Sequence, residues 1–285
     1  MADKKTAADG WQYYNGALIP TCAPHEEPDL TVLNDKSFFS KQLWDGKKPL
    51  FARYTTDFGC AEETDFWYVL TDKPFDISEQ KSKHRYEINK GIKNFTVKQI
   101  NPNDYLKSIF RVTVKAYESW PEKYRPKIAE DTFFDAIPHG EQARFFGAFL
   151  PESDTLVGYA VLQDFASYTS FNILRIDPDY EKLGLNAAIV YKILVDYADR
   201  LSSGAYINDG SRNISHETAF QNYLEKYFGF KKVYCRLRIK YTPKIKFFVK
   251  ALYPFKRLLK KFDNNPKIHR INAMLKMEEI ARSCR

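Results

Sequence analysis

The second half of the chain shows a regular succession of apolar patterns. Short apolar or alternating runs predict strands over 144–150, 156–165, 168–176, 205–208 and 231–241. Apolar residues three and four positions apart predict helices that begin at Asn101, lie within 127–136, and cover 185–201 and 214–228. This order predicts an α/β (α+β) fold with helices on a mixed sheet. Its cleft is expected where the strands that end at Ile176 and Asn208 diverge, beside a helix N-terminus.

The first half of the chain carries fewer patterned segments. Residues 1–35 are rich in proline and charge, so they are expected to be irregular. Strands are predicted over 49–54, 65–70 and 95–100, with a helix from Asp76 that stops at Gly91. These elements are too few for a full second copy of the later domain. The predicted division is an incomplete α+β subdomain over 1–95, a main domain over 96–241 and a helical tail over 242–285.

The composition of the 285 residues is that of a folded protein, with 44% hydrophobic and 28% charged residues. Aromatic residues make up 16%, which excludes a long disordered chain. No apolar run is long enough to span a membrane, and the first ten residues lack the apolar core of a signal peptide. Four cysteines form no disulfide framework, so a reducing cytoplasm is the expected location. No metal site is predicted, because Cys22 and His25 lack a second ligand pair.

Charge is distributed unevenly along the chain. Residues 231–285 hold 17 Lys and Arg against 3 Asp and Glu, whereas residues 1–230 hold 27 against 33. Within the tail, six apolar residues step by three and four: Ile245, Phe248, Leu252, Phe255, Leu259 and Phe262. Basic residues occupy the other side, and Pro254 is expected to kink or split the helix. This pattern over 244–262 predicts either peripheral binding to an anionic membrane at its inner face or packing on the protein's own body.

The segment from about 100 to 240 resembles the GCN5-related N-acetyltransferase (GNAT) family. The residues that carry the resemblance are the paired runs 145–149 and 156–160, the segment Arg175–Asn186, and the segment Tyr223–Phe230. The resemblance implies an acetyl-CoA donor whose pyrophosphate meets a strand end and a helix N-terminus. Here that site would comprise Ile176, Lys182, Leu183, Gly184, Leu185 and Asn186. Glu181 stands where the family has a basic or amide residue, and Tyr223 flanks the position of the family's general acid.

The chain as a whole resembles the FemAB-type transferases, which carry two such domains in tandem. The matching residues are 66–70, the run from Phe75, and the basic segment Lys83–Gly91. The resemblance implies an N-acyltransferase that moves an acyl group from acetyl-CoA to an amine, such as an amino sugar or lipid-linked sugar of cell-surface polysaccharide. Two alternatives stay open. One is aminoacyl transfer from tRNA, which could use the basic tail, and the other is a non-catalytic, membrane-associated module.

The densest polar run, 208–218, follows a predicted buried strand and opens a helix. Within it, Asp209 or His216 can serve as a general base, and Arg212 can clamp a carboxylate or phosphate. A glycine turn with a helix N-cap is the alternative interpretation of the same residues. A serine hydrolase is disfavoured because the chain has no nucleophile-elbow motif.

Overall fold

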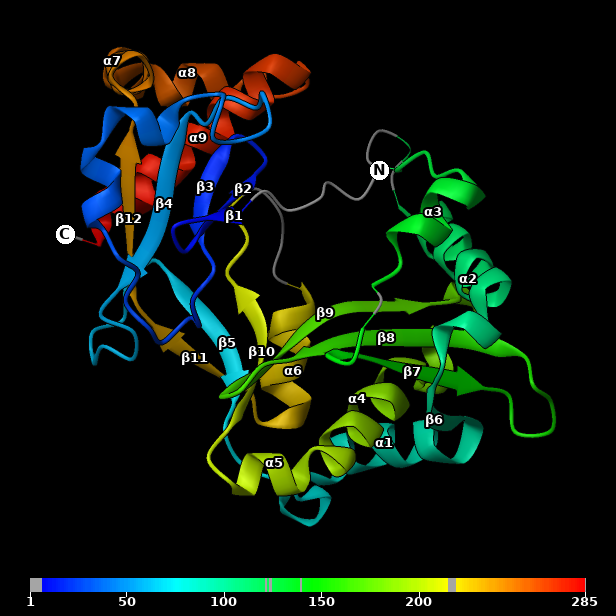
Figure 1. Cartoon of the computed structure of the whole chain (residues 1–285). Coiled ribbons are helices and arrows are strands. Elements are labelled where there is room, and N and C mark those ends of the chain that lie inside the picture. Colours follow the sequence, from blue (N-terminus) through cyan, green and yellow to red (C-terminus); the bar gives the residue numbers. More distant parts are fainter. Residues whose placement is uncertain (1–6, 121, 123–124, 139, 215–218, 285) are drawn as a thin grey trace. The chain divides into compact units, whose positions relative to one another are not determined.

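The computed structural model describes residues 7–120, 122, 125–138, 140–214 and 219–284 (Figure 1). Contacts between residues group the chain into two units, and neither is continuous in sequence. The first unit comprises Val69–Gly210 and Ala219–Lys231, and the second comprises the described residues of 7–68, 211–214 and 232–284. The division into 1–95, 96–241 and 242–285 stays a prediction about which segments fold by themselves.

Most of a seven-stranded mixed sheet lies in the first unit, and its strand order is β11-β5-β10-β9-β8-β7-β6. The strands, in chain order, are β5 (Trp67–Thr71), β6 (Thr96–Ile100), β7 (Ala143–Phe149), β8 (Leu156–Asp164), β9 (Tyr168–Ile176), β10 (Tyr206–Ser211) and β11 (Lys231–Tyr234). Strands β6 to β9 pair antiparallel, whereas β10 pairs parallel with β9. A parallel neighbour needs a crossover connection, and two helices between these strands supply it.

The helices of this unit cover the sheet and each other. They are α1 (Ser82–Asn94), α2 (Leu106–Glu118), α3 (Glu130–Ala136), α4 (Leu185–Asp196), α5 (Ala198–Ser202) and α6 (Ala219–Phe228). Helix α2 packs on β8 and β9, and α4 packs on β6, β7 and β8. Helix α1 packs in turn against α4. Covered from two sides, α4 buries seven of its residues, which explains its nearly continuous apolar sequence.

Several predicted boundaries in the first unit are wrong. Residues 77–79 form a separate 3₁₀ turn that Asp76 caps, and α1 begins only at Ser82. Gly91 lies inside α1, which continues to Asn94, because glycine is needed there for a close helix contact rather than for a stop. The helix predicted over 185–201 is divided at Tyr197 into α4 and α5. The strand predicted over 231–241 is two strands in different sheets.

The second unit contains a five-stranded sheet with the order β1-β2-β3-β4-β12. The strands are β1 (Ala7–Ala8), β2 (Trp11–Tyr14), β3 (Ala17–Pro20), β4 (Phe51–Thr56) and β12 (Arg236–Tyr241). The expectation that residues 1–35 are irregular is therefore wrong for the first three strands. Asp9-Gly10 and Asn15-Gly16 all adopt positive φ, the conformation that tight hairpin turns require. Trp11 and Leu18 are fully buried and anchor these hairpins.

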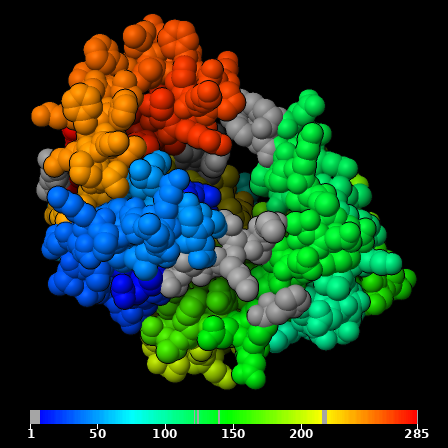
Figure 2. All heavy atoms as spheres, turned by 45° about the horizontal axis from the view of Figure 1, so that its top comes forward, coloured from blue at the N-terminus to red at the C-terminus, as the bar shows by residue number. Residues whose placement is uncertain are grey.

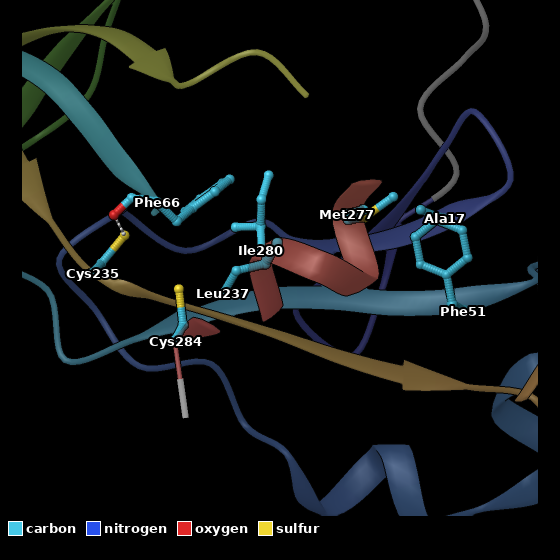
Figure 3. Close-up of a cluster of buried hydrophobic side chains, with 8 residues drawn as sticks. All are labelled: Ala17, Phe51, Phe66, Cys235, Leu237, Met277, Ile280 and Cys284. Carbon is cyan, nitrogen blue, oxygen red and sulfur yellow. Dashed lines mark hydrogen bonds between the residues drawn. The ribbon is translucent and has the colours of Figure 1, made fainter. Parts of the chain in front are cut away.

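Both faces of this smaller sheet are covered. One face carries the cluster Trp11, Leu18, Leu33, Phe38, Trp44 and Ala52, which includes the 3₁₀ turns at Thr31–Asn34 and Lys36–Phe39. Helix α9 (Pro266–Ser283) covers the other face, where its Met277 and Ile280 meet Phe51 and Leu237 (Figure 3). Helix α9 lies within the predicted helical tail over 242–285, but beyond the apolar stripe of 244–262. Before it, α7 (Pro243–Leu252), a 3₁₀ turn (Tyr253–Phe255) and α8 (Lys256–Lys260) confirm the predicted split at Pro254.

Ile280 is expected to hold α9 against the sheet. The side chain is 1% exposed, so Ile280→Ala should cost about 2–5 kcal/mol of unfolding free energy through lost burial and a cavity. Phe247→Ala is the matched control, because Phe247 is 72% exposed and should change stability little. Thermal unfolding of both variants tests this, and equal midpoints would show that α9 contributes no core to the second unit.

Candidate functional site

Strand β9 contains an irregularity opposite β8. Val161 of β8 is in register with Ile173, whereas the next residue, Leu162, is in register with Phe171. Asn172 is therefore an extra residue with no register partner on β8, which defines a β-bulge. Its side chain is exposed and shares a hydrogen bond with Ser170, with Oγ and Oδ1 2.7 Å apart. Bulges recur beside active sites because they redirect backbone and side-chain groups away from the ladder.

A hollow of about 360 Å³ adjoins this bulge, within the size range of small-ligand sites. Its lining consists of bulge, strand and loop residues from the first unit: Asn172, Val161, Leu162, Gln163, Ala143, Pro138, Gly140, Glu141 and Gln142. Asp209 lies outside this lining, on the neighbouring strand β10. Nothing in the sequence pattern singled out Asn172, because a bulge becomes visible only when two strands are paired.

Asp209 follows Asn208, which is in register with Ser170 of β9. Burial raises the pKa of the Asp209 carboxyl to about 7, although a hydrogen bond to Gln221 acts in the opposite direction. The Gln221 amide from α6 also donates to the carbonyl oxygen of Gly210, at 3.3 Å, so it is held in place. A carboxyl with a pKa near neutrality can both accept and release a proton at physiological pH. Asp209 thus has the protonation behaviour expected of a general base, and its catalytic role stays a prediction.

The other three predicted catalytic residues have different surroundings. Tyr223, on α6, is enclosed by aromatic rings, and burial raises the pKa of its hydroxyl, so the group stays protonated. Arg212 belongs to the second unit, where its guanidinium lies 4.5 Å from the Trp67 ring centroid and donates to the carbonyl oxygen of Asp65 at 2.6 Å. His216 lies outside the described residues. Their catalytic roles stay predictions.

The predicted cofactor loop is a 3₁₀ segment, Pro178–Leu183, followed by α4. Gly184 connects them with a φ of +86°, and the backbones of Gly184 and Gly91 are in close contact. The side chain of Asn94, at the end of α1, donates to the carbonyl oxygen of Leu183 at 3.1 Å. Leu185 is fully buried, so of the predicted ligand residues it is the least accessible. Helix α1 thus lies directly against the N-terminus of α4.

Helix α1 also contacts α6. The rings of His84 and Tyr227 lie 4.7 Å apart, and just before α1 the Phe75 ring contacts both Tyr191 of α4 and Phe228 of α6. Besides burial, charges of both signs act on this region: Glu87 and Glu181 act to raise the Tyr223 pKa, and three lysines act to lower the His84 pKa, namely Lys226, Lys81 and Lys83. The close contact between the backbones of Gly91 and Gly184 leaves no room for a pyrophosphate beside Gly184.

The described residues contain no group of three or more His, Cys, Asp or Glu side chains that could hold a metal ion. Nor does any helix within these residues have the length and apolar character needed to cross a bilayer.

No family model matches the chain, and a search of curated proteins finds no significant match. Among solved structures, it is similar to L-PGS from Bacillus licheniformis, with 12% identity, 96% of this chain and 86% of that one covered, and a TM-score of 0.51. The chain is also similar to FemX, with 11% identity, 78% of this chain and 81% of that one covered, and a TM-score of 0.48. The ribosomal-protein-S18-alanine N-acetyltransferase from Escherichia coli matches 37% of this chain and 60% of its own length, at 21% identity and a TM-score of 0.29.

At these identities the similarity concerns the fold. Together with the strand order, the parallel β9–β10 pair and the bulge, the match to L-PGS confirms the predicted GNAT-like fold.

Proposed function

We propose that the chain is an N-acyltransferase that transfers an acyl group to an amine. The observation that carries this proposal is Asp209, a carboxyl with a pKa of about 7 on the strand beside the bulged β9 of a GNAT fold. Fold alone does not determine activity, so the proposal depends on this group and its place.

The chemistry needs one bond to form and one to break. The amine nitrogen bonds to the acyl carbonyl carbon, and the bond from that carbon to the leaving sulfur or oxygen breaks. Asp209 takes the proton of the amine, directly or through one water molecule. Backbone amides at the bulge would stabilise the negative charge that develops on the carbonyl oxygen. Tyr223, kept neutral by burial, is our candidate to protonate the leaving group.

Two donors are consistent with this chemistry. Acetyl-CoA is the donor that the GNAT resemblance implies. A specific observation favours the second, an aminoacyl ester on tRNA: α1 lies against the N-terminus of α4, and its His84 ring contacts Tyr227 of α6. A donor that places no pyrophosphate at the N-terminus of α4 does not compete with α1 for that position. The basic residues of 231–285 would also attract RNA. The acceptor we propose is an amino sugar, free or lipid-linked.

Isothermal titration calorimetry with acetyl-CoA separates the two donors. If acetyl-CoA is the donor, we expect binding in the micromolar range, within the span of typical KM values. If α1 keeps the N-terminus of α4 covered, we expect acetyl-CoA to give no heat of binding up to millimolar concentration. The protein should then retain aminoacyl-tRNA on a filter at low salt. If neither acetyl-CoA nor aminoacyl-tRNA binds, the chain is better explained as a non-catalytic module.

A further inference from the structure

Large apolar side chains are exposed along residues 243–262, which we call the α7–α8 surface. These side chains are 54–72% exposed and are those of Phe247, Phe248, Phe255, Leu258 and Phe262. Folded proteins seldom leave neighbouring aromatic side chains in water unless a partner covers them. In Figure 2, α7, α8 and α9 form the orange to red surface at the top.

Packing on the protein's own body accounts for only one side of this segment. Val249 is buried, and Ile245, Leu252 and Leu259 are half-buried. Helices α7 and α8 both pack against α9, which is where this inner side finds its partners. The predicted stripe over 244–262 is therefore divided, because alternate members face α9 while the phenylalanines remain outside.

The charge of the α7–α8 surface indicates which kind of partner it would bind. Between Glu225 and Asp263 the sequence contains no acidic residue, and the segment carries exposed basic side chains: Lys244, Lys246, Lys250, Arg257, Lys260 and Lys261. Aromatic residues among lysines and arginines are the composition of segments that lie in the interface of an anionic membrane. A protein partner would have to supply both an apolar groove and a dense acidic rim.

A hollow of about 490 Å³ lies between α8 and α9. Lys256 and Lys276 both donate to Glu279, at 2.8 and 2.9 Å, and hold the pKa of its carboxyl at about 2. A second acidic group, Asp263, accepts from the Asn272 amide at 2.8 Å and lies 2.9 Å from His269.

Two further cations, Arg257 and Lys260, line the same hollow. Within the described part of the chain, neither makes an ion pair or a hydrogen bond. The acidic groups of the hollow are thus occupied, while two cations beside exposed apolar side chains remain available.

We propose that the α7–α8 surface docks on an anionic phospholipid membrane. The exposed phenylalanines enter the boundary between headgroups and acyl chains, and Arg257 and Lys260 receive a lipid phosphate in the α8–α9 hollow. Docking does not require acyl transfer, because no residue of the surface is among the catalytic candidates, although its basic residues belong to the segment proposed to attract RNA. It would nevertheless hold the enzyme where lipid-linked acceptors lie.

Co-sedimentation of the full-length protein with vesicles tests the proposal. Phosphatidylcholine vesicles that contain phosphatidylglycerol should carry the protein down at low salt and release it at high salt, since about 1 M salt shortens the Debye length to about 3 Å. Vesicles of phosphatidylcholine alone should carry down much less. Equal sedimentation with both kinds of vesicle, unaffected by salt, would refute the role of charge.

Two variants separate the apolar and the basic contributions. Phe247→Ser with Phe248→Ser and Phe255→Ser should weaken binding about a hundredfold, if each phenylalanine contributes about fivefold. Arg257→Gln with Lys260→Gln should weaken binding to the anionic vesicles about 25-fold, since each basic residue near the surface is worth about fivefold.

The controls change the same kinds of residue elsewhere. Tyr86→Ser removes an aromatic side chain that is 64% exposed on α1, and Lys93→Gln with Lys107→Gln removes two exposed charges. Both should bind like the parent, and thermal unfolding checks that every variant is folded.

Two outcomes besides salt-independent sedimentation overturn the proposal. One is that surface variants and controls bind alike. The other is a parent that ignores vesicles but dimerises in sedimentation velocity through the same phenylalanines, which would make the surface an interface between copies of this chain. Loss of acyl transfer in any assay leaves the vesicle result unchanged, so the two proposals fail separately.

Discussion

Replacing Asp209 by Asn is expected to lower turnover by about 10²–10⁴-fold, the usual contribution of a general base. Asparagine keeps the shape and the capacity to hydrogen-bond Gln221, but it cannot take a proton. In the parent protein, activity should rise with pH through about 7, because the carboxyl must be ionised to act. Initial rates across pH test both expectations, and Asp154→Asn, which changes a largely exposed carboxyl, is the control.

The same substitution should raise stability at alkaline pH. The folded pKa of about 7 lies above the ordinary value of 3.8, so the carboxyl favours the folded state below about pH 4. That contribution is lost as pH rises through about 7, where the folded protein must bury a charge. Asp209→Asn should therefore be more stable than the parent at pH 8, by on the order of 4 kcal/mol, and should differ little from it at pH 4.

The combination of lost activity and gained stability identifies a functional group rather than a structural one. If the variant keeps full activity while its stability rises, Asp209 is only a buried acid and the proposed mechanism loses its base. If stability falls at all pH values, the Gln221 contact is structural.

Gly91→Ala is expected to be among the most destabilising single changes in the first unit. An added Cβ would overlap the carbonyl oxygen of Gly184 and lie 2.9 Å from the backbone nitrogen of Ala188, and neither backbone atom can move cheaply. Separating α1 from α4 should cost about 2–4 kcal/mol, even though alanine favours the helix by about 1 kcal/mol. Thermal unfolding should show a loss of about 4–16 °C, at about 2–4 °C per kcal/mol.

Gly204→Ala is the matched control for the added methyl group. Gly204 has a φ of +92° but no atom within 4 Å of an added Cβ, so it should lose only about 1–2 kcal/mol from the left-handed conformation. A Gly91→Ala variant as stable as the parent would mean that α1 can move away from the N-terminus of α4. Acetyl-CoA would then become the favoured donor again.

Much of the fold follows from local sequence. The strands β7, β8 and β9 and the helix α4 lie within one or two residues of their predicted starts, because continuous or alternating apolar runs describe elements buried in a sheet core. The kink at Pro254 was equally predictable, since proline lacks an amide hydrogen. The hairpins that end at Pro20 also have a sequence signal, the turn dipeptides Asp9-Gly10 and Asn15-Gly16. The prediction of irregular structure gave more weight to the proline and charge content of this segment.

Other features required long-range contacts. Helix α9 has only a weak apolar stripe, and its burial follows from the sheet face that it must cover. Gly91 has the sequence signature of a helix end, yet its role is the contact with Gly184, 93 residues later. Glycine is compatible both with a helix end and with a close contact between helices. Only the segment that packs against it decides which role it has.

The sequence by itself determined the order of elements, the GNAT resemblance, the basic tail and the polar run that contains Asp209. These depend on residue type and spacing, which are local properties. Only the tertiary structure decided that Asn172 forms a bulge, that α1 lies against the N-terminus of α4, and that the phenylalanines of the α7–α8 surface stay in water. It also decided the pKa of Asp209, because desolvation depends on every atom packed around a carboxyl and not on the residues beside it in the chain.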